Sequence, residues 1–130
     1  MEALKNPLLI FGLPLLLITL HTVAILTGIY GLVNHFDSIM HFVGGVVSAV
    51  SVLGILAYAI EKDWIKIDDQ NVSRLLVIGM VALIALAWEL FELGFDAYFG
   101  THWQPSIRDS LKDQVLGVFG AVMVVLKLRV

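Results

Sequence analysis

The chain has 130 residues, of which 59% are hydrophobic and 15% are charged, and its mean hydropathy is +0.93. These values lie outside the usual balance of a soluble domain. The net charge of -3 and the lack of a basic stripe exclude nucleic acid as a partner, and without cysteine the chain has no thiolate metal site. We interpret it as an integral membrane protein.

Four apolar runs each predict a helix that crosses the bilayer, because a span needs about 20 mostly apolar residues. They cover about residues 7–30, 39–60, 75–97 and 108–128. The fourth is the weakest, since its apolar part begins at about Val115 and is extended backward through a polar stretch. We expect an all-α, polytopic membrane protein with one transmembrane domain over residues 1–130, folded as a bundle of four transmembrane helices.

The basic residues predict how these spans are oriented. With a cytoplasmic N-terminus, six lysines and arginines fall inside and two fall outside, as the positive-inside rule requires. The inner set is Lys5, Lys62, Lys66, Arg74, Lys127 and Arg129, and the outer set is Arg108 and Lys112. We therefore predict a multi-pass protein of the cell membrane with both termini in the cytoplasm.

The same topology gathers the unusual ionisable residues of the spans near the extracytoplasmic side. Within each span these residues recur at helical spacing, so each set shares one helix face. Such groups are costly toward lipid and normally face protein or a water-filled cavity. The sets are Asp37 and His41 in the second span, Glu89, Glu92 and Asp96 in the third, and Asp109 and Asp113 in the fourth.

Among these residues, the position of Glu89 most needs an explanation. The fourteen residues 75–88 carry no charge and correspond to about 21 Å of helix, which places Glu89 within the hydrocarbon core. Clustered carboxylates repel one another unless a cation joins them or some are protonated. The seven residues of the three sets are therefore candidate ligands of a divalent metal. A mixed Asp, Glu and His set suits Zn²⁺, Mn²⁺ or Fe, and Mg²⁺ less clearly.

Simpler roles compete with metal binding. The acids could be hydrogen-bonded or protonated groups that set helix register, and Asp37 and Asp109 could cap helices, since acids are favoured in a first turn. His21, near the middle of the first span, fits packing or an interhelical hydrogen bond better than a ligand role.

Three stretches carry a resemblance to a known group of proteins. "FDSIMHFVGG", "WELFELGFD" and "RDSLKDQVLGVFGA" resemble small bacterial and archaeal membrane proteins related to the YjdF-like and VanZ-like families. The resemblance implies a shared polar site without a settled activity. Such sequences often have an asparagine four residues after the last aspartate, where this chain has Gly117. The matching positions are Asp37, His41, Glu89, Glu92, Asp96, Asp109 and Asp113.

The sequence leaves three functions open. The leading hypothesis is a metal-dependent hydrolase or transferase that acts on a lipid headgroup, with Glu89 or Glu92 as general base. The alternative is a non-enzymatic subunit of a larger membrane complex or homo-oligomer, in which the acids are structural. The third is a proton or cation carrier, for which the cytoplasmic halves of the third and fourth spans offer almost no polar groups.

Overall fold

The computed structural model describes residues 2–104 and 106–128, which form helices and contain no strand. The all-helical class is therefore confirmed. The four predicted ranges fall on η2 with α1, on α3, on α4 and on α5. The elements are η1 (Glu2–Lys5), η2 (Leu8–Gly12), α1 (Leu13–Thr27), α2 (Ile29–Leu32), α3 (Phe36–Glu61), α4 (Gln70–Phe99) and α5 (Ile107–Lys127).

Capping hydrogen bonds explain where α4 and α5 begin. The Asp69 side chain accepts a hydrogen bond from the backbone N–H of Asn71 at 2.6 Å and caps α4. The Ser106 hydroxyl likewise accepts from the N–H of Asp109 at 3.1 Å and caps α5. Each cap satisfies a backbone donor that the first turn of a helix leaves free. Gly100, with a φ of 67°, ends α4 in the left-handed conformation that favours glycine.

The first predicted range departs from a regular α-helix at both ends. A π-helical turn, η2, runs into α1 without a break, and Pro14 stands just after the junction, where a proline cannot donate the usual backbone hydrogen bond. Gly28, with a φ of 74°, ends α1 earlier than expected. Tyr30 therefore belongs to the short α2 rather than to the spanning helix.

Three segments are long and apolar enough to cross a membrane: Leu8–Thr27, Phe36–Glu61 and Gln70–Phe99. The fourth expected span, α5, opens with a charged stretch, "IRDSLKD", which lowers its apolar length. A bundle of four spanning helices therefore stays a prediction.

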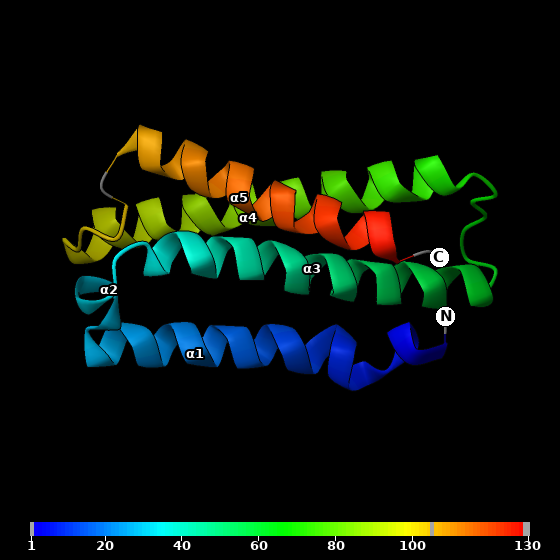
Figure 1. Ribbon diagram of the computed structural model, residues 1–130, viewed down its shortest axis with the longest axis horizontal. Coiled ribbons are helices and arrows are strands. Elements are labelled where there is room, and N and C mark those ends of the chain that lie inside the picture. The colour runs from blue at the N-terminus through cyan, green and yellow to red at the C-terminus, as the bar shows by residue number, and fades with distance from the viewer. Residues whose placement is uncertain (1, 105, 129–130) are drawn as a thin grey trace.

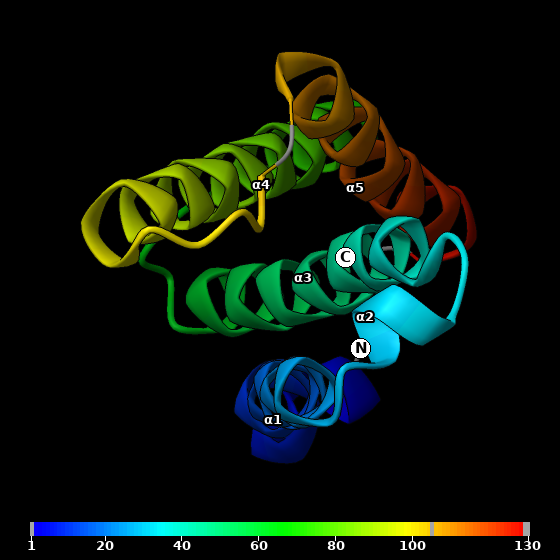
Figure 2. The same ribbon diagram turned by 90° about the vertical axis from the view of Figure 1, so that its left-hand side faces the viewer.

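Helix α3 lies in the middle of the structure and contacts α1, α4 and α5 (Figures 1 and 2). A core of small and branched side chains fills the space between α3, α4 and α5. Among the described residues, no Cα atom of α1 comes within 8 Å of one in α4 or α5. Helix α1 thus packs on the opposite side of α3, as Figure 2 shows. The core residues are Ala49, Leu53, Leu56, Val77, Val81, Ala121, Val124 and Val125.

The two ends of the helices carry different parts of the chain. At one end, η1 and the last turn of α5 lie on the same side of the structure as the α3–α4 loop (Figure 1). Lys5 pairs with Glu61 there. The other end, which we call the α2 end, carries α2 and the loop of residues 100–104. This arrangement suits two termini on one side of a membrane, and which side that is stays a prediction.

Candidate metal centre

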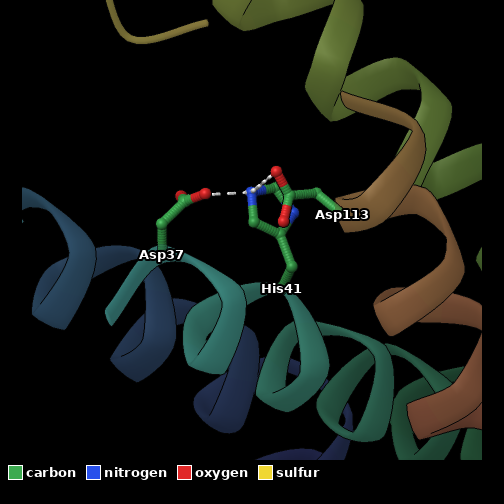
Figure 3. Close-up of side chains that lie close together, drawn as sticks. All are labelled: Asp37, His41 and Asp113. Atoms are coloured by element: carbon green, nitrogen blue, oxygen red, sulfur yellow. Dashed lines mark ion pairs between the residues drawn. The ribbon is translucent and has the colours of Figure 1, made fainter. Parts of the chain in front are cut away.

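His41, in the second turn of α3, lies at the middle of a cluster of acids near the α2 end. Its Nε2 atom is 3.4 Å from Oδ1 of Asp37, which stands one helical turn earlier. Both side chains rise from the same face of α3 (Figure 3). The helical spacing of four residues is what brings them together.

Asp113 reaches His41 from a different helix. Its Oδ2 atom is 4.0 Å from His41 Nε2, and the residue is 3% exposed (Figure 3). Two glycines make this approach possible, because Gly117 and Gly120 bring α5 against the backbone of α3. Lys112 Nζ lies 3.5 Å from the other carboxylate oxygen of Asp113.

Two glutamates of α4 complete the cluster. Oε1 of Glu89 is 3.7 Å from His41 Nδ1, the ring nitrogen that faces away from the aspartates. The other oxygen of Glu89 accepts a hydrogen bond from the side-chain amide of Gln104 at 2.7 Å. Glu92 lies one turn further along α4 and accepts a hydrogen bond from the indole N–H of Trp88 at 2.9 Å. Both glutamates are buried.

Two groups of side chains in this cluster could hold a metal ion. One is Asp37, His41 and Asp113, and the other is His41, Glu89 and Glu92; within each, one ligand atom per residue lies within 4.8 Å of the others. The structure therefore brings together five of the seven candidate ligands from three helices, with His41 common to both groups.

The other two candidates lie outside these groups. Asp96 accepts hydrogen bonds from the Thr101 hydroxyl at 2.5 Å and from the backbone N–H groups of Trp103 and Gln104 at 2.9 and 2.8 Å. Asp96 therefore holds the loop that follows α4 in place through these hydrogen bonds. Asp109 accepts a hydrogen bond from Lys112 at 2.5 Å and stands in the first turn of α5.

The comparison with protein families bears on the whole chain. Residues 3–130 match a family described as "Predicted membrane protein (DUF2238)". The chain belongs to this family. No curated protein and no solved structure matches it. Membership supports a multi-pass location in a membrane, and the likeness to YjdF-like and VanZ-like proteins stays a prediction.

For a DUF2238 protein, bilayer lipid explains the many exposed apolar side chains. Leu26, Leu75 and Ile107 are 81%, 72% and 82% exposed, values that would be costly in water. Lipid also raises the free-energy cost of any polar atom of the cluster that lacks a partner, because such an atom is costly in a medium of low polarity.

Two oxygens of the cluster have no such partner among the described residues. Oε1 of Glu89 and Oδ1 of Asp113 are buried and accept no hydrogen bond. The two residues are 5% and 3% exposed, so bulk water does not compensate them. Each is available to a cation or to a proton, and His41 and Lys112 are the nearby basic groups.

Gln104 is the functional neighbour that the sequence does not point to. It lies in the irregular loop "THWQPS", where no periodicity indicates which side chain turns back toward α4. Its amide also reaches the backbone carbonyl of Glu89 at 3.2 Å, so it holds that residue at two points. Trp88 stands four residues before Glu92 on α4, and this spacing places its indole within reach of that carboxylate.

His21 pairs with an aromatic hydroxyl instead of an acid. Its Nδ1 atom lies 2.5 Å from the Tyr30 hydroxyl, and its ring packs edge-on against Trp88 with centroids 5.0 Å apart. These contacts are of the packing and hydrogen-bonding kind that the sequence favours for this residue. They connect α1 to α2 and α4 near the α2 end.

Proposed function

We propose that this membrane protein binds one divalent metal ion between Asp37, His41 and Asp113. The observation that carries the proposal is the position of Asp113. Its buried carboxylate faces His41 Nε2 through Oδ2 from a second helix, opposite Asp37, while Oδ1 lies 3.5 Å from Lys112 Nζ and accepts no hydrogen bond from the described residues. A cation between the two aspartates would compensate their repulsion.

Glu89 then acts on the metal through His41. Metal-binding histidines usually donate the N–H of their second ring nitrogen to a carboxylate or carbonyl, which sets the tautomer and the ring orientation. Glu89 Oε1, which accepts no hydrogen bond from the described residues, stands 3.7 Å from His41 Nδ1. Gln104 holds the glutamate in place from the other side. This assigns Glu89 a positioning role and leaves Nε2 to the metal.

The donor set limits the metal and its chemistry. One imidazole nitrogen with carboxylate oxygens suits Zn²⁺, Mn²⁺ or Fe²⁺ better than Mg²⁺, which prefers oxygen ligands alone. Three protein ligands leave coordination positions for water or substrate, as in catalytic rather than structural sites. The cluster therefore has the composition of a reactive centre.

The reaction that this arrangement supports is hydrolysis of an ester or phosphoester of a lipid. A metal held by Asp37, His41 and Asp113 would supply a Lewis acid for the attack of water on the acyl carbon or the phosphorus, with loss of the leaving oxygen, and Glu92 would take the proton of the water. Glu92 belongs to the group around His41 but lies outside the three proposed ligands. The leaving oxygen would receive the proton in turn.

Elemental analysis of the detergent-purified protein tests the metal directly. We expect near-stoichiometric metal in the wild type and a large loss in Asp113→Asn and His41→Gln. Asp109→Asn is the matched control, since it removes a carboxylate from the same helix outside both groups. Metal retained in Asp113→Asn, or none in a folded wild type, would contradict the proposal.

The absence of metal from a folded wild type would favour a structural role for the acids. In that case a protonated His41 would neutralise Asp37 and Asp113, and Lys112 would supply a further positive charge. The exposed apolar side chains could then serve contacts with partner subunits as well as lipid. Purification from native membranes would show whether the protein is always accompanied by other chains.

We also propose that the cluster faces the extracytoplasmic side. The distribution of lysine and arginine supports this orientation. Because the chain has no cysteine, one introduced cysteine reports on one position. A thiol reagent that cannot cross the membrane should label His102→Cys, at the α2 end, in intact cells. It should label Lys66→Cys, on the α3–α4 loop, after lysis, and the reverse pattern would refute the orientation.

A further inference from the structure

A groove in the apolar part of the protein reaches His41, one of the residues of the proposed metal centre. It lies where α1 and α4 diverge across α3 and has a volume of about 200 Å³. Leu17 and Ile18 of α1 form one wall, and Val81 and Ile84 of α4 form the other. The small residues Gly44 and Ser48 of α3 form the floor, which leaves the space open.

The groove runs along the helices. Its lining extends from His21 to Pro14 on α1, from Met40 to Ser48 on α3 and from Trp88 to Val81 on α4. Seven steps of about 1.5 Å separate the first and last of eight helical residues, so the lining is about 10 Å long, about a third of a hydrocarbon core about 30 Å thick. A chain lying in the groove would therefore run beside the helices, in the direction of lipid chains in the bilayer.

One end of the groove is polar and the rest is apolar. His41, which belongs to both metal-capable groups, lines the groove near the α2 end together with His21 and Tyr30. Toward the other end the lining is aliphatic, apart from Ser48. This division matches a molecule with a polar head and a hydrocarbon tail, in which the head lies at His41.

Other occupants fit the groove less well. A helix of a second copy, with a diameter of about 10 Å and a pitch of about 5.4 Å, would meet the groove over about two turns only, because the lining is about 10 Å long. Water needs two to four polar partners per molecule, which the aliphatic walls do not offer. A hydrocarbon chain needs no polar partners and is the material that surrounds the protein.

We propose that this groove binds the hydrocarbon chain of a single-chain anionic amphiphile and directs its head group to the metal centre. The head-group part rests on the proposed metal, to which a carboxylate or a phosphate would bind, with Lys112 beside Asp113 as a further positive charge. The groove would thereby select lipids by their chain, whereas the cluster would act on or recognise their heads.

Photo-crosslinking tests the groove at the level of residues. The protein is placed in phosphatidylcholine vesicles with a small fraction of a twelve-carbon alkyl phosphate that carries a diazirine in its chain, and labelled residues are mapped by mass spectrometry. We expect labels on the groove-lining parts of α1 and α4 that saturate and are displaced by dodecyl phosphate. Butyl phosphate, which lacks the chain, should not displace them.

A pair of matched variants separates the groove from the general lipid surface. Gly44→Leu fills the floor, and a Cβ atom there would meet only Leu17 at 3.7 Å, an ordinary contact. Gly79→Leu adds the same side chain to α4 where nothing lies within 4 Å. We expect Gly44→Leu to lower the saturable labelling by about tenfold, about 1.4 kcal/mol of binding free energy, since the leucine side chain would occupy the space in which the hydrocarbon chain lies. Gly79→Leu should label as the wild type does.

The outcomes distinguish this proposal from the metal centre. Labelling that is unchanged in Gly44→Leu, with metal still bound, would overturn the groove and leave the metal centre standing. If Gly44→Leu loses the labelling and the wild type holds no metal, the results would support the chain site and contradict the metal centre. A parallel probe with a carboxylate in place of the phosphate identifies the head group, as the one that competes more strongly.

Discussion

Gly45 of α3 faces Gly117 of α5 so closely that a Cβ atom at Gly45 would lie 1.9 Å from the Gly117 carbonyl oxygen. The neighbouring contact is equally tight, because a Cβ atom at Gly120 would lie 2.4 Å from the carbonyl oxygen of Phe42. Small residues permit such approaches between helices in membranes. This crossing lies one turn from Asp113 and His41, so it sets how near the two helices bring these ligands.

Replacing Gly45 by alanine should therefore disturb both stability and the site. The added Cβ atom meets backbone, which cannot turn aside, and overpacking of this kind costs about 1–3 kcal/mol. Gly44→Ala is the control, since its Cβ atom would find an ordinary contact. Unfolding in detergent measures the cost, and equal stability of the two variants would contradict the packing argument.

Gln104→Ala should weaken metal binding without removing a ligand. Its amide donates to Glu89, which in turn stands beside His41 Nδ1, so its loss leaves the orienting glutamate less restrained. Loss of such outer partners typically lowers metal affinity about 10–100-fold. Titration with Zn²⁺ or Mn²⁺ would measure the change. An affinity equal to that of the wild type would argue against Glu89 as the group that positions His41.

Asp96→Ala should loosen the loop after α4 more than it affects the metal. Thr101, Trp103 and Gln104 donate hydrogen bonds to this carboxylate, and each lost bond to a charged group is worth about 1.5–3 kcal/mol. Hydrogen exchange of the amides at 101–104 should accelerate. Metal content at saturating metal should stay near that of the wild type, whereas its loss to the extent seen in Asp113→Asn would restore Asp96 as a ligand.

The contact between Lys5 and the end of α3 should depend on pH. The carboxylates of Glu2 and Glu61 raise the pKa of Lys5 above its ordinary value of 10.5. A raised pKa means that the protonated lysine stabilises the fold, fully below pH 10.5 and progressively less as the pH rises through the higher folded value.

Thermal unfolding of wild type and Lys5→Gln at several pH values measures this contribution. We expect the wild type to be the more stable below pH 10.5 and the difference to vanish above the raised pKa of Lys5. Lys66→Gln, on the exposed α3–α4 loop, serves as the control. A difference that persists unchanged at the highest pH would assign the effect to packing of the lysine stem.

Much of the site was predictable because it depends on local spacing. Asp37 and His41 stand four residues apart, as do Asp109 and Asp113, and the helical period alone places each pair on one face. Burial of the acids followed from the cost of charge in lipid, and Glu89, Glu92 and Asp113 are indeed buried. Spacing along one helix does not tell which faces of different helices meet.

The sequence by itself determined the helices, since long apolar runs bounded by capping residues and glycines specify them locally. The tertiary structure decided which acids share a site. The glycine contacts of α5 bring Asp113 to His41. The loop that follows α4 folds back on this helix and donates three hydrogen bonds to Asp96, which keeps this carboxylate out of the cluster. The tertiary structure also decided that the backbones of α1 and α4 stand apart and meet only through side chains such as His21 and Trp88, which opens the groove, because such contacts depend on residues far apart in the chain.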